Sequence, residues 1–93
     1  MNNNRRKEIE RIAERISSLL NDLSEIKDSI GAVRDEEQDA LDNLPESMQE
    51  GERGERAQAA IDALEEALSG MEDAESGLND IKDNLETAKE GPT

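Results

Sequence analysis

The sequence predicts an all-α protein: an antiparallel two-helix hairpin of the coiled-coil type that assembles into a four-helix bundle or a higher oligomer. Three observations support this fold class. Apolar residues recur at heptad spacing in two long stretches, Pro45 interrupts the chain between them, and the 93 residues include no Phe, Tyr, Trp, Cys or His. A chain of this length buries a modest fraction of its surface. Without aromatic side chains, its core must come from aliphatic residues.

The first helix is predicted over residues 5–43, after a flexible polar tail of residues 1–4. Its apolar residues alternate steps of three and four, which is the a/d stripe of a coiled coil. They are Ile9, Ile12, Ile16, Leu19, Leu23, Ile26, Ile30 and Val33. Since Pro45 disfavours helical geometry in the residue before it, the helix is expected to end near Asn43.

The second helix is predicted over residues 55–89, followed by a tail of residues 91–93. One row of apolar residues recurs every seven positions: Ala57, Leu64, Met71, Leu78 and Leu85. A second row lies beside it: Ala60, Ala67, Ala74, Ile81 and Ala88. Alanine permits close helix approach, so this helix is expected to contact two neighbours. Gly70 and Gly77 repeat at the same spacing and indicate either a second close-packing edge or a solvated face.

The joint between the helices is predicted over residues 44–54, within one hairpin domain of residues 5–90. Pro45 suits the first turn of a short helix and Gly51 suits its end. Glu52 and Glu55 stand at the start of the second helix, where carboxylates favour the helix dipole.

An antiparallel register follows from folding the chain about this joint. It places Val33 opposite Leu64, Ile26 opposite Met71, Leu19 opposite Leu78, and Ile12 opposite Leu85. Two helices cannot cover so wide an apolar stripe, and helices gain most of their stability from packing. Pairing two hairpins gives a four-helix bundle. A homodimer is therefore expected, with a higher cyclic assembly as the alternative.

The charge is strongly acidic, with 25 Asp and Glu against 11 Lys and Arg and a net charge of -14. Such a surface repels nucleic acid and anionic membranes, so neither is an expected direct ligand. No apolar run approaches the length of a signal-peptide core or a membrane span. A cytoplasmic protein is the simplest expectation.

The composition argues against an enzyme and against a cofactor. With no His and no Cys, the chain lacks the usual groups for proton transfer near neutrality and for thiol nucleophilic attack. The acidic run of Asp35, Glu36, Asp39 and Asp42 lacks the spacing of an EF-hand loop. It is better explained as a solvated acidic face than as a metal site, so no metal is expected.

The joint holds the best candidates for ligand or partner binding: Arg53, Arg56, Ser47 and Gln49. Backbone amides at a helix start, beside two arginines, can hold a phosphate or a carboxylate. The alternative is a surface network of the arginines with neighbouring glutamates. We favour the network, because surface ion pairs are common and a phosphate would meet those glutamates.

Glu37 is a further candidate because it interrupts the apolar stripe of the first helix. It acts either as a register device, where the helix turns outward near its end, or as a buried carboxylate paired with Arg56. The first interpretation is favoured. A buried pair would add little net stability but would fix the alignment of the two helices.

Residues 34–49 read RDEEQDALDNLPESMQ, and residues 52–55 read ERGE. This segment resembles a motif of small uncharacterised helical proteins of phages and prophages; the remaining heptads are too general to add to it. The resemblance implies a phage accessory protein that acts in the host cytoplasm. Small helical phage proteins of this size include inhibitors of bacterial immunity, some of which sequester cyclic nucleotide signals in oligomeric bundles.

Three functions are therefore considered. The first is a non-enzymatic oligomeric binding protein, a phage or prophage accessory protein of the anti-defence inhibitor type, that binds a host factor. The second is a sponge that sequesters a phosphorylated cyclic nucleotide at the joint or at a subunit interface. Missing aromatic residues weaken this alternative, because bases usually stack on aromatic rings or arginine planes. The third is an acidic mimic of nucleic acid.

Overall fold

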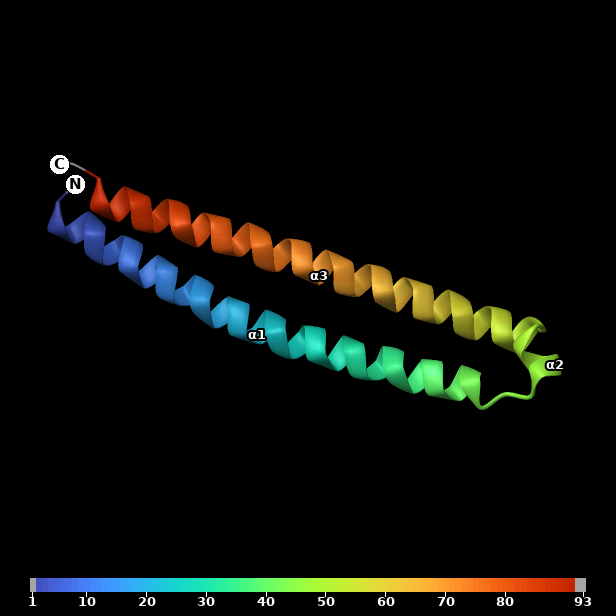
Figure 1. Ribbon diagram of the computed structural model, residues 1–93. Coiled ribbons are helices and arrows are strands. Elements are labelled where there is room, and N and C mark those ends of the chain that lie inside the picture. The colour runs from blue at the N-terminus through green and yellow to red at the C-terminus, as the bar shows by residue number, and fades with distance from the viewer. Residues whose placement is uncertain (1, 92–93) are drawn as a thin grey trace. The chain divides into compact units, whose positions relative to one another are not determined.

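The computed structural model describes residues 2–91. Three helices follow one another along the chain (Figure 1): α1 (Asn3–Asp42), α2 (Glu46–Gln49) and α3 (Glu52–Glu90). No strand occurs among the described residues. The all-α fold class is thus confirmed, and the two long helices pack against each other as in a hairpin.

The chain forms two compact units. We call Met1–Ser24 with Glu72–Thr93 the terminal unit, because it combines the start of α1 with the end of α3. We call Glu25–Met71 the joint unit, because it contains α2 and the adjoining parts of both long helices. Within each unit, α1 and α3 run antiparallel, side by side (Figure 1).

Contacts between α1 and α3 confirm that the two helices lie close to the predicted register. In the terminal unit, Arg6 Nε donates a hydrogen bond to the Lys89 carbonyl oxygen at 3.2 Å. Lys89 Nζ lies 3.9 Å from Glu10 Oε1. In the joint unit, Arg34 Nη1 lies 3.6 Å from Glu65 Oε1.

Helix α1 begins at Asn3, inside the segment 1–4 that the sequence suggested as a flexible tail. The cause is Asn2, whose Oδ1 accepts a hydrogen bond from the Arg5 backbone N–H at 2.9 Å. An asparagine in this position satisfies one of the free N–H groups of the first helical turn. At the other end, Gly91 N donates to the Ala88 carbonyl at 3.3 Å. Residues 92–93 of the expected C-terminal tail, like residue 1, lie outside the described residues.

The joint contains the short helix that Pro45 and Gly51 predicted. Pro45 precedes α2 with φ -56° and ψ 146°, so the chain is extended immediately before the helix. Helix α3 then begins at Glu52, inside the segment 44–54 that the sequence assigned to the joint. Glu52 and Glu55 fall in its first turn, where their charges favour the helix dipole.

The buried apolar core is small. Among the described residues it consists of Ala13, Leu23, Ala57 and Ile61, and only Ile61 is fully buried, at 1% exposure. The remaining residues of the seam between α1 and α3, such as Ile16 and Leu64, are half-buried. Two helices therefore exclude water from a narrow strip only.

The predicted apolar stripe of α1 divides into two rows with different environments. Ile9, Ile16 and Ile30 are half-buried and Leu23 is buried. By contrast, Leu19, Ile26 and Val33 are 50%, 51% and 52% exposed. The prediction that these three side chains face α3 directly was wrong, although the axial alignment was correct. A seam between two helices is about two rows of residues wide. The row of Leu19, Ile26 and Val33 lies outside the seam, on its flank.

Candidate functional site

The five residues that the sequence proposed for binding all belong to the joint unit, but the structure does not bring them together in one site. Arg53 and Ser47 line one shallow depression, together with Met48, Gly51 and Glu52. Arg53 also borders a second depression, which Glu37 and Leu44 line from α1 and from the segment after it. Gln49 and Arg56 are engaged elsewhere.

Gln49 closes the end of α1. Its Nε2 donates a hydrogen bond to the Leu44 carbonyl at 2.8 Å and lies 3.5 Å from the Asp42 carbonyl. Carbonyls at a helix end lack partners within the helix, so a side-chain amide there satisfies the backbone. The amide donor proposed for ligand binding is thus already used to hold the joint together.

Arg56 pairs with Glu52, one helical turn earlier on α3. Both side chains are about three-quarters exposed, at 76% and 77%. Glu37 is half-buried and lines a depression to which Arg53 contributes and Arg56 does not. The alternative in which Glu37 pairs with Arg56 is therefore wrong, and the surface network interpretation describes Arg56 correctly.

Carboxylates surround the places where an anion could bind in the joint. Glu52 lines the depression of Ser47 and Arg53, and the first turn of α3 already carries Glu52 and Glu55. A neighbouring depression of about 530 Å³ is lined by Asp42, Glu50 and Glu55, together with glutamines. This volume would admit a small molecule, but the three carboxylates disfavour a phosphate.

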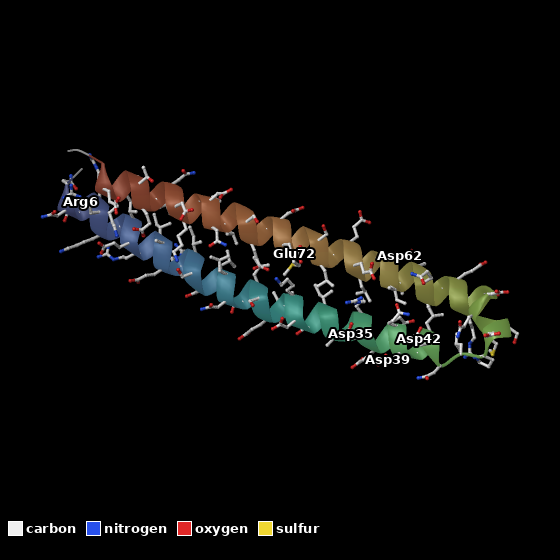
Figure 2. All side chains as sticks on the ribbon, in the orientation of Figure 1. Arg6, Asp35, Asp39, Asp42, Asp62 and Glu72 are labelled. Carbon is white, nitrogen blue, oxygen red and sulfur yellow. The ribbon has the colours of Figure 1, made fainter. Side chains whose placement is uncertain are left out.

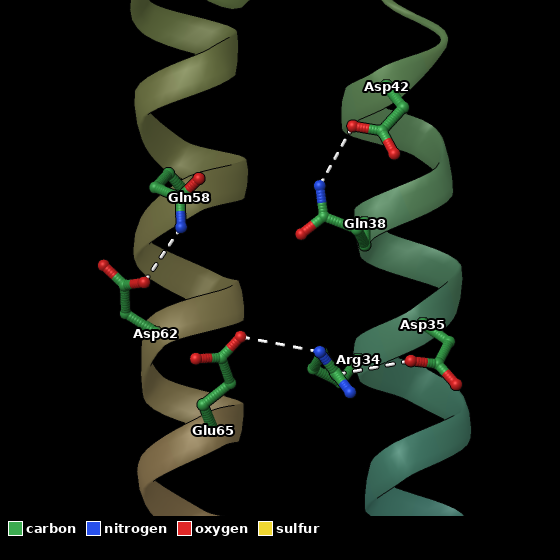
Figure 3. Close-up of polar contacts among 7 residues, drawn as sticks. All are labelled: Arg34, Asp35, Gln38, Asp42, Gln58, Asp62 and Glu65. Carbon is green, nitrogen blue, oxygen red and sulfur yellow. Dashed lines mark hydrogen bonds and ion pairs between the residues drawn. The ribbon is translucent and has the colours of Figure 1, made fainter.

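A polar surface that the sequence reasoning missed lies between α1 and α3 in the joint unit (Figure 3). Arg34 is its centre: Nη1 lies 3.6 Å from Glu65 Oε1 and Nε lies 3.3 Å from Asp35 Oδ1. Arg34 stands seven residues before Leu41 in a half-buried row of α1. The sequence signal for this contact was the cation at a seam position of α1, because a charge there needs a partner across the seam.

Two amide–carboxylate pairs flank this arginine. Gln38 Nε2 donates to Asp42 Oδ1 at 3.0 Å on α1, and Gln58 Nε2 donates to Asp62 Oδ1 at 2.9 Å on α3 (Figure 3). Each pair spans one helical turn, the spacing at which side chains of a helix meet. These contacts order the polar surface but leave its carboxylates exposed to solvent.

The terminal unit has a smaller mixed-charge surface. Lys89 Nζ lies 3.2 Å from Glu86 Oε2 and reaches Glu10 across the seam. Lys82 and Glu14 line a depression together with Glu10, Glu86 and Lys89.

The acidic run of α1 is exposed to solvent. Asp35, Glu36, Asp39 and Asp42 are all exposed, and the aspartates lie along α1 in Figure 2. Within residues 2–91, no group of three or more carboxylates is arranged to hold a metal ion. In the same residues, no helix has both the length and the apolar composition that crossing a membrane requires.

Comparison of the chain with protein-family models, with curated proteins and with solved structures found no match.

Proposed function

We propose that the chain is a non-catalytic, oligomeric helical binding protein, which uses an acidic surface to bind a basic region of a partner protein. The partner would be a host factor, and the chain a phage or prophage accessory protein of the anti-defence inhibitor type acting in the host cytoplasm. One observation carries the proposal: the exposed carboxylates far outnumber the cations that could neutralise them.

The charge balance is independent of how the ion pairs are arranged. Pairing all 11 Lys and Arg with carboxylates would still leave a net charge of -14. Several pairs are moreover local to one helix, as for Arg11 with Glu8 and Arg56 with Glu52. A surface of one sign attracts a partner of opposite sign and accelerates the encounter.

The acidic run of α1 is the part of this surface with the highest charge density. Asp35, Glu36, Asp39 and Asp42 lie within eight consecutive residues and are all exposed. This exposed charge favours the run as the region that contacts the partner, and the sequence expectation of a phage-type motif falls on the same residues. The absence of His and Cys from the sequence supports a role without catalysis.

The test compares two variants that remove the same charge from different places. One variant combines Asp35→Asn, Asp39→Asn and Asp42→Asn in the acidic run. Its control combines Glu66→Gln, Asp73→Asn and Asp80→Asn, which are exposed positions of α3. Immobilised protein captures a partner from bacterial lysate, and calorimetry then measures the affinity of the purified partner for each variant.

We expect the acidic-run variant to lose at least about tenfold in affinity, or about 1.4 kcal/mol, and the control to lose much less. Binding should also weaken as salt is raised, because exposed charges are screened. Equal affinities for the two variants, or binding that does not respond to salt, would contradict the proposal. Competition by DNA would identify the partner as a nucleic-acid-binding protein and the chain as its mimic.

A nucleotide sponge is less well supported, because carboxylates line all three depressions to which Ser47, Gln49 and Arg53 contribute. A thermal-shift experiment with linear and cyclic nucleotides tests it directly. A ligand at a hundredfold excess over its dissociation constant would stabilise the protein by about 2.7 kcal/mol.

A further inference from the structure

The joint unit exposes apolar residues on one side of its helix pair. On α1 these are Ile26 and Val33, which are 51% and 52% exposed, followed by Ala40. On α3 they are Ala60 and Ala67, which are also exposed.

The two exposed rows emerge on the same side for a geometric reason. Val33 follows the seam residue Ile30 by three positions, and Ala67 follows the seam residue Leu64 by three. Both rows are therefore rotated in the same sense away from the seam of their own helix. Because α1 and α3 run antiparallel, equal rotations bring the two rows to one face. We call the face formed by Ile26, Val33, Ala40, Ala60 and Ala67 the apolar face of the joint unit.

The terminal unit repeats the arrangement at the same heptad positions. Leu19 on α1 is 50% exposed and Ile81 on α3 is 48% exposed. Ala74 and Ala88, seven residues on either side of Ile81, are exposed as well. Each unit thus has large apolar side chains on α1 and mostly small ones on α3.

A second row of small residues runs beside the first along α3. Ala63 and Gly70 alternate with Ala60 and Ala67 in the joint unit, and Gly77 follows Ala74 by three residues in the terminal unit, which is the spacing of a second heptad seam. A methyl group built on Gly70 or Gly77 would meet no atom within 4 Å. None of these positions is charged, in a chain where 39% of residues are charged. Small side chains at this spacing permit close helix packing, yet in the structure described for residues 2–91 all six positions are exposed.

The accessible surface is larger than expected for a compact folded protein of this mass. The chain exposes 6692 Å², whereas a folded protein of 10.3 kDa is expected to expose about 5,400 Å². The excess is about 1,300 Å², and a standard interface covers about 800 Å² per partner. The excess total area is thus larger than one partner's share of a standard interface.

We propose that a second copy of this chain covers the apolar face, so that the large row of α1 in one copy packs on the small row of α3 in the other. Large residues facing small ones give uniform helix spacing and a filled core. The joint unit supplies both halves of this match, since Ile26 and Val33 on α1 and Ala60 and Ala67 on α3 all lie within it. Its lack of charge removes the repulsion that the acidic surface would otherwise impose. This self-association is independent of the acidic partner-binding surface proposed above.

The first test measures the oligomeric state by sedimentation velocity and light scattering, with matched pairs of variants. Ile26→Glu and Ala67→Glu place a carboxylate on the apolar face. Ser24→Glu and Ser69→Glu place it at exposed positions two residues away on the same helices, outside the apolar rows. We expect the wild type and both serine variants to be dimers at tens of micromolar. The face variants should dissociate at least tenfold more readily.

A second test does not risk unfolding the helices, because it changes only small side chains. The chain has no cysteine, so Ala67→Cys and Ser69→Cys each introduce a single thiol on exposed α3 positions. In the dimer, maleimide should label Ala67→Cys at least tenfold more slowly than Ser69→Cys, and the two rates should converge on dilution.

Several outcomes would overturn the proposal. They are a wild type that stays monomeric at several hundred micromolar, a stoichiometry other than two, and equal labelling of the two thiols at every concentration. Selective protection of Ser69→Cys would place the interface on the opposite side. Protection of Ala67→Cys only after a purified partner is added would show that the occupant is a different protein.

Discussion

Gly54 is the residue on which the geometry of the joint depends most. It is buried at the start of α3, and a Cβ atom there would lie 1.7 Å from the Gln49 carbonyl oxygen and 2.4 Å from its carbonyl carbon. Real Cβ atoms do not approach backbone atoms so closely, and the backbone of α2 cannot move aside without breaking the turn. Only glycine permits this approach of α2 to α3.

We therefore predict that Gly54→Ala destabilises the protein by about 2 kcal/mol or more, because the joint must open to admit the methyl group. Gly51→Ala is the matched control, because its added Cβ would lie 3.6 Å from the Met48 carbonyl, an ordinary contact. Urea denaturation followed by circular dichroism at fixed protein concentration measures both. Equal midpoints for the two variants would contradict this account of the joint.

Gln49 offers a second test at the residue scale, since its side chain caps α1 in the structure but was proposed from sequence as a ligand contact. Gln49→Ala should cost about 1 kcal/mol through loss of the hydrogen bond to the Leu44 carbonyl. Gln49→Glu should cost more, because a carboxylate would then face carbonyl oxygens that need a donor. A stability equal to that of the wild type in both variants would mean that the cap contributes nothing.

At the scale of the helices, heptad spacing predicted the number and direction of the long elements and their axial alignment. It did not predict their rotation. Ile12, Ile16, Leu19 and Leu23 form one continuous a/d pattern, so the pattern alone does not reveal which rows face α3 and which lie on the flank. The structure settles this, with Leu23 buried and Leu19 half exposed.

The candidate site was predictable only as a region. Pro45, Gly51 and the glutamates of α3 located the joint and its short helix correctly. The pair of Arg56 with Glu52 agrees with the surface network favoured from the sequence, since the two residues stand one helical turn apart on α3. The sequence could not indicate that Gln49 turns back to cap α1 or that Arg34 bridges to Glu65. Each of these contacts depends on how neighbouring segments pack, and chain spacing does not encode that packing directly.

Gly31 permits a prediction about α1 as an element. It lies in the interior of the helix, and an added Cβ would meet nothing within 4 Å. Gly31→Ala should therefore stabilise the protein by roughly 0.5–1 kcal/mol, through the higher helix propensity of alanine. For a domain of this size, each kcal/mol raises the melting temperature by about 4–8 °C. A lower melting temperature would mean that this glycine packs against another chain.

At the scale of the whole molecule, charge and apolar surface oppose each other. The net charge of -14 favours expanded and dissociated chains through self-repulsion. The small core and the exposed apolar rows favour association. The cross-helix ion pairs are partly exposed, and such pairs contribute little stability that salt could remove. Screening should therefore act mainly on the repulsion.

We predict that raising NaCl from 10 mM to 300 mM increases the melting temperature and shifts self-association toward the dimer. The screening length is roughly 30 Å at 0.01 M and about 10 Å at 0.1 M, so repulsion among distant carboxylates is largely removed over this range. Circular dichroism melts and sedimentation at the same protein concentration measure the two effects. The variant with Asp35→Asn, Asp39→Asn and Asp42→Asn should respond less, because it carries less charge to screen. A melting temperature that falls with salt would instead show that ion pairs such as Arg34–Glu65 outweigh the repulsion of the acidic surface.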